Sequence, residues 1–504
     1  MTRVVAGDVT AAAAGRPADV VAYGRHTGGA VSAFCRRRGF VARPGQVVAE
    51  PSADGRSVVL NVGLGPAGAA TAATFRAAAA AAVRAAGPAR TLRLELAPAG
   101  DGGVPAADRD RAVAEGAVLG LYRYDEYRSA RAASPLAEVV VATGERRAVA
   151  EGLAVAEATC LARDLVNRPA GALTPPVFAD RIRELAGAAG LGCAMYEAAG
   201  LTELGLTGLA AVGRGSAEPP RYVELTYEPP EGEPVLTVGL VGKGVTFDSG
   251  GLSLKPSGER HAMKADMAGA AAVVAALTAL PRLGLPLRVR GHLPLAENMP
   301  DGGALRVGDV VRHLDGTTTE ITHTDNEGRV VLADVLVRAS GPGPHRADLV
   351  IDVATLTSAA VHALGTRTGA LFTPDEWLAR TVLAASERAG ESVCRLPLLA
   401  HERRHLRSTV ADRVNCSHRH GDTVQAALFL QDFVADGVRW AHLDIAAPAY
   451  NDEGPYAEVP HGGTGFAVRT LTETLRALCG GAPDTGPDLR EPSGSGSESR
   501  SRSW

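Results

Sequence analysis

Short strand-like runs alternate with alanine-rich helical stretches along most of this 504-residue chain, and this alternation is the strongest constraint on its fold. The first 150 residues hold the runs VVAY, SVVLNVGLG, TLRLEL and EVVVAT, with helical stretches such as residues 69–86 between them. Farther along, VLTVGLVG, LRVRGHLPL and ADLVIDVAT again alternate with helical stretches. Strands that alternate with helices predict an α/β fold.

The chain is longer than one hydrophobic core usually fills, so we expect more than one domain. We predict a smaller N-terminal α/β domain over residues 1–150 and a connecting helix over 151–168. A larger C-terminal α/β domain over 169–480 should contain a central mixed sheet flanked by helices. Residues 481–504 are rich in Ser, Gly and Arg and are expected to be disordered.

Composition excludes several classes of protein. Hydrophobic residues make up 46% of the chain and charged residues 21%, which is typical of a soluble globular protein and not of a disordered or fibrous one. The net charge of −4 argues against nucleic-acid binding. Six widely spaced cysteines indicate reduced thiols. The longest uncharged run, residues 57–75, contains Asn61 and Pro66 and predicts no membrane span. We therefore expect a soluble cytoplasmic protein.

Lysine is rare, and its placement is informative. Only three of the 52 basic residues are lysines, and Lys243, Lys255 and Lys264 all fall within one window of 22 residues. Arginine cannot replace lysine where an amine must lose its proton or bind a metal. Chance clustering is the alternative, but it leaves the other unusual residues of this window unexplained.

Acidic residues accompany these lysines. The strand-like run VLTVGLVG leads into KGVTFDSGG, Asp266 precedes a helix predicted over residues 267–280, and TDNEGR (324–329) opens another helix. The four carboxylates are those of Asp248, Asp266, Asp325 and Glu327. Their summed charge of about −4 matches two divalent cations, and without metal they would repel one another. The alternative is that they are solvated loop acids and helix caps, Asp266 especially.

The segments VGKGVTFDSGG, KPSGERHAMKADMAGAAAV and HTDNEGRVVLADVL resemble the leucyl aminopeptidase (cytosol aminopeptidase) family of dimetal exopeptidases. RDLVNRPAGALTPPVFA, AENMPDGGALRVGDVV, DVATLTSA and WAHLDIA resemble further family segments in the expected order. The resemblance is strong over residues 150–475 and weak before them. It implies a catalytic C-terminal domain and a macro-like N-terminal domain.

The resemblance also implies roles for single residues. Two zinc or manganese ions would be held by five side chains: Lys243, Asp248, Asp266, Asp325 and Glu327. Of these, Asp248 and Glu327 would bridge the ions. Lys243 and Asp266 would complete the tighter site, and Asp325 would complete the more exchangeable one. A hydroxide bridging both ions would attack the peptide bond, in keeping with two-metal chemistry.

Further positions match residues that act on the substrate. Lys255 would be the catalytic lysine, and Arg329 would hold a bicarbonate that acts as general base. The free N-terminal amine of the substrate would bind one metal and Asp266. Met263 would line the specificity pocket, and the backbone of Leu356 would contact the substrate. The resemblance thus implies removal of N-terminal, Leu-like residues from peptides.

Four positions near these residues depart from the family pattern. His323 stands where the family usually has Asn, and Asn326 where it has Ala. Ser358 and Ala268 each replace a common Gly. No proposed ligand is missing, so the departures bear on leucine preference and rate rather than on metal binding.

Two other motifs compete with this interpretation. HERRH (401–405) matches the HExxH zinc pattern, which on an α-helix would place both histidines on one face with Glu402 as base. Nearby, His418 and His420 are further possible metal ligands, although surface positions are expected for both. GLGPAG (63–68) follows a strand and imitates a dinucleotide fingerprint, with Glu95 as the possible ribose ligand.

A function of a different class also remains open. Some relatives bind DNA through N-terminal surfaces, and Arg36–Arg38 form a small basic run here, although the acidic balance opposes strong binding. A weakened enzyme that serves as an oligomeric scaffold is the second option. By analogy the family assembles as a homohexamer.

Overall fold

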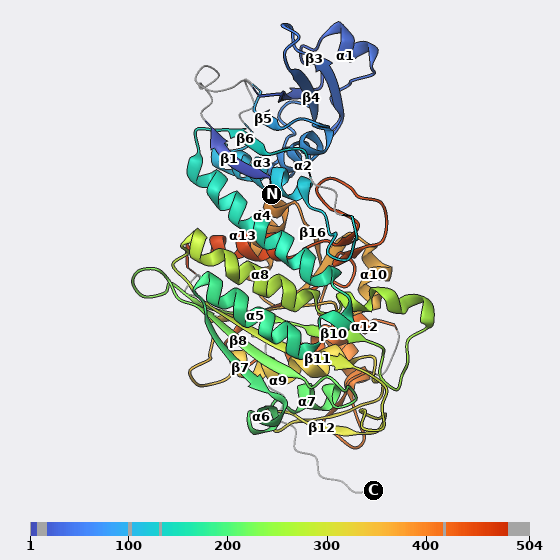
Figure 1. Cartoon of the computed structure of the whole chain (residues 1–504). Helices are drawn as coiled ribbons and strands as arrows, with labels where there is room; N and C mark the ends of the chain where they lie inside the picture. The colour runs from blue at the N-terminus through green and yellow to red at the C-terminus, as the bar shows by residue number, and fades with distance from the viewer. Residues whose placement is uncertain (1, 8–17, 99–102, 131–133, 417–419, 482–504) are drawn as a thin grey trace, which may run out of the picture.

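The computed structural model describes residues 2–7, 18–98, 103–130, 134–416 and 420–481. Its two α/β parts lie one above the other in Figure 1, and helix α4 runs between them. The predicted α/β class and its two-part organisation are therefore confirmed. From residue 482 onward, the predicted disordered tail lies outside the described residues, as does His418.

The N-terminal part is a six-stranded sheet with the order β1-β6-β5-β2-β4-β3. Its strands are parallel except β3, which runs antiparallel to β4. The strands are β1 (Arg3–Gly7), β2 (Val20–His26), β3 (Val47–Pro51), β4 (Val58–Gly65), β5 (Thr91–Glu95) and β6 (Glu138–Ala142). The helices are α1 (Ala33–Arg37), α2 (Ala72–Ala85) and α3 (Ala106–Leu121). All four predicted strands are present, and β1 and β3 were missed.

The alanine-rich composition of this part serves close helix packing. Helices α2 and α3 lie side by side, and a Cβ added at Gly116 of α3 would lie 2.0 Å from the carbonyl oxygen of Arg76 in α2. Ala78 and Ala79 of α2 are fully buried in the same core. Small side chains therefore let the two helix backbones approach each other, which larger core residues would prevent.

Helix α4 (Arg146–Asn167) connects the two parts and begins five residues before the predicted start at residue 151. It packs against α3 of the N-terminal part and against α8 and α13 of the C-terminal part. Its Arg163 is fully buried and donates through Nε to the carbonyl oxygen of Thr464 and through Nη2 to that of Glu458. The connecting helix is thus part of the core rather than a free linker.

The C-terminal part contains a mixed nine-stranded sheet with the order β16-β15-β18-β14-β9-β11-β8-β7, and β10 pairs with β11. The strands are β7 (Gly192–Glu197), β8 (Arg221–Tyr227), β9 (Thr237–Gly242), β10 (Gly244–Asp248), β11 (Arg288–Asn298), β14 (Leu349–Ala354), β15 (Thr368–Phe372), β16 (Ser392–Arg395) and β18 (Arg439–Asp444). In the centre of the sheet, strands β18, β14, β9 and β11 run parallel to one another. Strands buried on both faces of a parallel sheet have nearly continuous apolar sequences, as these do.

Two hydrophobic cores cover the two faces of this sheet. Helices α4, α5, α8, α11 and α13 contribute to one core, and α6, α7, α9 and α12 contribute to the other. The helices are α5 (Pro175–Ala189), α6 (Ala198–Glu203), α7 (Thr207–Gly213), α8 (Ala268–Leu283), α9 (Glu327–Ser340), α10 (Ser358–Leu364), α11 (Glu376–Ala389), α12 (Asp422–Gln431) and α13 (Val468–Leu478). The 3₁₀ helices are η1 (Ala170–Ala172), η2 (Ser257–Ala265) and η3 (Ala400–Leu406).

Two smaller sheets complete this part. They consist of β12 (Val310–Arg312), β13 (Thr318–Glu320) and β17 (Arg413–Val414), and of β19 (Tyr450–Asn451) with β20 (Gly462–Gly463). Among the described residues, one segment, His261–Leu283, is long and apolar enough to cross a membrane. However, 83% of its most apolar window is buried inside the protein, so it is the central core helix α8 with the end of η2.

Candidate metal centre

The candidate site forms where neighbouring strands of the central sheet end. Strands β9 and β14 are adjacent and parallel, so Lys243, which follows β9, lies beside Thr355, which follows β14. The backbone N–H of Lys243 donates to the carbonyl oxygen of Val353. Helix α8 starts just after Asp266, and helix α9 starts at Glu327. The carboxyl edge of a sheet is where α/β proteins usually place their ligands.

Lys243 is the centre of one half of the site. Its buried Nζ lies 2.8 Å from Asp266 Oδ1, 2.8 Å from Glu327 Oε1 and 2.9 Å from the carbonyl oxygen of Thr355. Asp266 also accepts a 2.8 Å hydrogen bond from Thr355 Oγ1. Asp266 is not the N-cap of α8, because Met267 occupies that position; Asp266 instead follows η2, and its backbone N–H caps the end of that helix.

Lys255 is the centre of the other half. Its Nζ lies 2.7 Å from Asp248 Oδ2 and 2.5 Å from Asp325 Oδ1. Asp248 is buried at the end of β10, and its Oδ1 accepts hydrogen bonds from the backbone of Gly250 and from Asn298 Nδ2. All four predicted carboxylates and both lysines therefore meet in one cleft.

The carboxylates of this cleft outnumber the lysines by two, and the pKa values reflect this excess. Burial and the carboxylates of Asp248 and Glu327 together raise the pKa of Asp325 to about 7, against the opposing effect of Lys255. Burial likewise raises the pKa of Asp266 well above its ordinary range despite the adjacent Lys243. Burial lowers the pKa of Lys243, but Asp266 and Glu327 more than offset this, so the pKa lies above its ordinary value. The cleft favours added positive charge.

The donor set fits divalent cations. Asp248, Asp325 and Glu327 each bring one oxygen within 4.8 Å of the others, a grouping that can surround a metal ion. Within the described part of the chain, Asp266 Oδ2 is buried without a hydrogen-bond partner. A buried carboxylate oxygen that lacks a hydrogen-bond donor and lies beside other carboxylates is expected where that oxygen is a metal ligand.

Several residues that complete this geometry were missed from the sequence. A Cβ added at Gly328 would lie 2.7 Å from Lys243 Nζ, so only glycine lets α9 approach this lysine. Asn298 donates both to Asp248 Oδ1 and to the carbonyl oxygen of Thr324, and so ties together the two acidic loops. Thr355 fixes Lys243 and Asp266 together. Gly328 was visible in the EGR motif, whereas the partners of Asn298 and Thr355 depend on the tertiary fold.

Arg329 lies behind the cleft and is 1% exposed. Its Nη1 donates 2.8 Å to the carbonyl oxygen of Asn415, and its Nη2 donates 2.8 Å to Asp422 Oδ1. Both terminal nitrogens are therefore engaged by this chain. A bicarbonate that paired with both terminal nitrogens would have to displace the Asp422 carboxylate, whereas Nε is buried and has no hydrogen-bond partner among the described residues.

The predicted substrate-binding positions border the cleft. Met263 lies half-buried in the last turn of η2, and its carbonyl oxygen accepts from the backbone N–H of Asp266. Leu356 directly follows Thr355, and its Cδ1 would lie 2.9 Å from a Cβ added at Gly328. The Met263 backbone therefore contacts that of Asp266, and the Leu356 side chain lies beside the start of α9.

Comparisons with known proteins agree with this geometry. Residues 160–472 match the catalytic domain of the cytosol aminopeptidase family, and residues 4–131 match the N-terminal domain of the same family. The chain belongs to the cytosol aminopeptidase family. It is therefore a peptidase, a hydrolase of the leucyl aminopeptidase type with aminopeptidase activity.

Individual relatives cover nearly the whole chain. The "Probable cytosol aminopeptidase" of Streptomyces coelicolor is 42% identical over 483 residues, which span 90% of this chain and 91% of that one. The structure of the bottromycin maturation enzyme BotP in complex with Mn is 88% identical, covers 92% of this chain and all of that one, and has a TM-score of 0.88. The structure of a tomato leucine aminopeptidase mutant is 31% identical, covers 94% of this chain and 96% of that one, and has a TM-score of 0.84.

The positions that depart from the aminopeptidase family pattern lie around the acidic loop and the helix starts. His323 is exposed, and its Nδ1 accepts from the backbone N–H of Asp325. The carbonyl oxygen of Asn326 accepts from Asn415 Nδ2. Ser358 begins α10, and Ala268 begins α8. His323 and Asn326 therefore contribute to the loop that carries Asp325 without replacing a carboxylate.

The competing HERRH motif does not have the geometry of a zinc site. It lies in the 3₁₀ helix η3, where residues four apart point in different directions rather than to one face. His401 is 63% exposed, and Glu402 accepts a hydrogen bond from Gln425 Nε2. His420 contributes its backbone carbonyl oxygen to the same Gln425. These residues form a surface hydrogen-bonding cluster.

The GLGPAG motif does not have the geometry of a dinucleotide site. Gly63 and Gly65 lie within β4, and a Cβ at Gly63 would lie 2.1 Å from the carbonyl oxygen of Arg43. Close approach of two backbones therefore explains Gly63. Glu95 ends β5, which is separated from β4 by β2, and it pairs with Arg93 at 2.6 Å.

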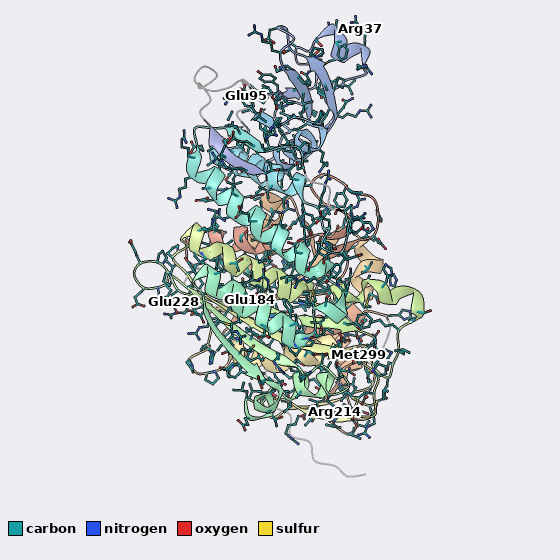
Figure 2. The ribbon with its side chains drawn as sticks, viewed as in Figure 1. Arg37, Glu95, Glu184, Arg214, Glu228 and Met299 are labelled. Atoms are coloured by element: carbon teal, nitrogen blue, oxygen red, sulfur yellow. The ribbon has the colours of Figure 1, made fainter. Side chains whose placement is uncertain are left out.

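The basic run Arg36–Arg38 lies at the far end of the N-terminal part. Figure 2 shows Arg37 at this tip, at the opposite end of the molecule from Arg214, which follows α7. Arg36 Nη1 donates to the carbonyl oxygen of Val31, and the Arg38 guanidinium lies over the ring of Phe34. Two of the three arginines thus have local partners.

Proposed function

We propose that this aminopeptidase depends on metal ions and removes hydrophobic, Leu-like N-terminal residues from peptides. The observation that carries the proposal is the cleft in which four carboxylates face two lysines and leave Asp266 Oδ2 unsatisfied among the described residues. Structural ion pairs balance their charges, whereas this cleft retains an excess of negative charge that divalent cations would neutralise.

The proposed ligands are the five side chains Lys243, Asp248, Asp266, Asp325 and Glu327. Manganese or zinc suits this donor set, and the Mn complex of the bottromycin maturation enzyme supports manganese. When bound, two such cations supply Lewis acidity that activates water and stabilises negative charge on the scissile carbonyl oxygen. Lys243 would give up its proton on binding, because a metal-ligating amine must be neutral.

Lys255 is proposed as the catalytic cation of this chain. Burial lowers its pKa, but the carboxylates of Asp248, Glu327 and Asp325 more than offset this and hold the pKa above its ordinary value. Its ammonium group therefore keeps its proton at neutral pH. A fixed ammonium in this cleft can donate a hydrogen bond to the oxygen on which negative charge develops.

The cleft also accounts for a requirement for a free N-terminus. Asp266 Oδ2 can accept a hydrogen bond from the protonated or metal-bound amine of a substrate. Met263 would line the pocket for the first side chain, which favours a hydrophobic residue there, and the backbone of Leu356 would contact the substrate. Acetylation would remove the positive charge of the amine and the lone pair that could bind a metal, so an acetylated substrate should bind poorly.

The natural substrate is proposed to be a precursor peptide in bottromycin maturation. The basis is the 88% identity to the bottromycin maturation enzyme over 92% of this chain. An aminopeptidase contributes to maturation by exposing a new N-terminus, so this chain would remove an N-terminal residue before or between other maturation steps.

Assembly, location and domain limits are further parts of the proposal. A cytoplasmic homohexamer is supported by the family resemblance and by relatives named cytosol aminopeptidases, and six free cysteines suit a reducing compartment. A particle mass of six times 51.7 kDa in light scattering is expected. The limits 1–150, 151–168 and 169–480 are supported by the separate sheets on either side of α4.

Hydrolysis of leucyl-p-nitroanilide and of dipeptides tests the function. The purified chain is freed of metal with a chelator and then assayed alone, with Mn²⁺ and with Zn²⁺. Metal-dependent turnover that is lost when the substrate is N-acetylated is the expected result. Turnover that survives chelation, or equal turnover of the acetylated substrate, would contradict the proposal.

A further inference from the structure

The partners of Arg329 show how the positive charge behind the cleft is neutralised. The guanidinium is 1% exposed, and a buried cation that lacks a nearby anion is strongly destabilising. The Asp422 carboxylate lies 2.8 Å from Nη2 and supplies that anion. The third nitrogen, Nε, is buried and has no hydrogen-bond partner in the described part of the chain.

Asp422 is held in place from its own side as well. It is the first residue of α12, and Gly421 before it adopts a left-handed conformation with φ of 75°. An acidic side chain in the first turn of a helix is favoured by the helix dipole. Its side chain is 17% exposed, so the pair with Arg329 lies at the edge of solvent, within reach of small ions.

Arg329 connects this pair to the loop that carries two proposed ligands. Its Nη1 donates to the carbonyl oxygen of Asn415. The Asn415 side chain in turn accepts from the backbone N–H of Thr322 at 2.8 Å and donates to the carbonyl oxygen of His323 at 2.8 Å. Thr322 and His323 directly precede the TDNEGR segment, so a shift of Arg329 would be transmitted to Asp325.

We infer that Asp422 is a positioning residue that serves as the built-in anion of Arg329, so that catalysis by this chain is independent of bicarbonate. The inference rests on the proposed function and deepens it. Asp422 accepts a hydrogen bond from Nη2 and already balances the charge of the guanidinium, so no external anion is needed for that purpose. It thereby fixes the guanidinium, Asn415 and the Asp325 loop in one arrangement without a dissociable ion.

The inference predicts chemical rescue. Asp422→Ala removes the carboxylate and leaves a space of similar size beside Arg329, which bicarbonate or formate can fill. Asp422→Asn is the matched control, because its amide fills the same space without the charge. Loss of an outer hydrogen-bonding partner of a metal site typically costs about 10- to 100-fold in activity or metal affinity.

The experiment compares the wild type with both variants in carbon-dioxide-free buffer with Mn²⁺. Leucyl-p-nitroanilide turnover is measured with added bicarbonate, formate or chloride at equal ionic strength. We expect the wild type to be insensitive to all three anions. Asp422→Ala should lose about 10- to 100-fold and regain activity with bicarbonate or formate but not chloride. Asp422→Asn should lose activity without rescue.

Thermal unfolding of the same proteins gives a readout that does not depend on turnover. A ligand that binds the native state raises the unfolding midpoint, so bicarbonate should stabilise Asp422→Ala and leave the wild type unchanged. Stimulation of the wild type by bicarbonate, or an Asp422→Ala variant that is fully active or unresponsive to both anions, would overturn the inference. A wild type without metal-dependent turnover overturns the proposed function instead, and the unfolding data still decide the role of Asp422.

Discussion

Two buried clusters in this molecule both combine carboxylates with basic side chains, but they differ in how completely the charges are paired. One lies around α13, where Arg469 is 3.3 Å from Glu391 Oε1 and 2.5 Å from Glu458 Oε1. The second oxygen of Glu391 accepts from the backbone N–H of Thr470 at 3.0 Å and from its hydroxyl at 2.6 Å. In this cluster each acid has a guanidinium or hydroxyl partner. The other cluster is the cleft around Lys243 and Lys255.

The pKa values separate the two clusters. Burial raises the pKa of Glu458, but Arg469 and Arg76 together more than offset this and hold the pKa below its ordinary value. In the cleft, the pKa of Asp325 rises to about 7, because burial and neighbouring carboxylates outweigh Lys255. The cluster around Arg469, in which acids and cations are paired, stabilises the fold. The cleft around Lys243 and Lys255 has an excess of carboxylates and can bind cations. Excess charge, rather than burial, distinguishes a metal centre from a structural ion pair.

The largest expected effect comes from Lys243→Arg. The guanidinium keeps the positive charge but cannot become a neutral ligand, so the tighter metal position should be lost. We expect kcat/KM to fall on the order of 10³-fold, about 4 kcal/mol of transition-state stabilisation. Lys264→Arg is the matched control, because Lys264 Nζ donates to the carbonyl oxygen of Asn167 and lies over the Tyr450 ring, away from the carboxylates. A kcat/KM of Lys243→Arg close to that of the wild type would show that Lys243 is not a metal ligand.

The next largest effect should follow Arg469→Met, and it should be on stability. This change leaves Glu391 and Glu458 buried without their guanidinium, which should cost about 4 kcal/mol of unfolding free energy. Arg388→Met is the control, since its pair with Glu473 is partly exposed and worth less than about 1 kcal/mol. Denaturant unfolding measures both. Equal losses of unfolding free energy in Arg469→Met and Arg388→Met would contradict a stabilising role for the buried Arg469 cluster.

A smaller effect is expected from metal ions on stability. At a free Mn²⁺ concentration 100 times the dissociation constant, each occupied site should add about 2.7 kcal/mol to the unfolding free energy. The gain should shrink in Lys243→Arg and persist in Arg469→Met. Calorimetric unfolding with Mn²⁺ and with chelator measures it, and an undiminished gain in Lys243→Arg would show that the ions bind elsewhere.

The smallest expected effect concerns pH and a third buried cluster. Burial lowers the pKa of His292 to about 4, although Glu224 opposes the shift. The other groups that face it are Tyr222, Arg290, Arg338 and His345. The unfolded histidine takes up a proton near pH 6.5, so the stability present at neutral pH is lost as the pH falls from about 6.5 towards 4.

His292→Gln removes this titration. Between pH 7 and 5, the wild type should lose about 2 kcal/mol more than the variant. Unfolding free energies of both proteins at the two pH values measure the difference. If both proteins show the same pH dependence, His292 is not held neutral. Mn²⁺ affinity at fixed pH should be the same in both, because this cluster is distinct from the cleft.

Much of this could be predicted from the sequence, because the decisive signals are local. The apolar runs predicted the central strands, and KGVTFDSGG and TDNEGR placed the acids at strand ends and helix starts. Contacts between distant segments were not predictable in this way. Asp422 meets Arg329 because α12 packs beside α9, and Asn415 meets Thr322 because β17 pairs with β13. The competing HERRH motif shows the same limit, since its spacing does not distinguish an α-helix from the 3₁₀ helix of η3.

Manganese stoichiometry tests the central claim most directly. Metal-free wild type and Lys243→Arg are dialysed to equilibrium against Mn²⁺, and bound metal per chain is determined by elemental analysis. The account predicts two ions per wild-type chain and loss of the tighter one in the variant. A wild type that binds no more than one ion, or a variant with unchanged stoichiometry and affinity, would contradict it.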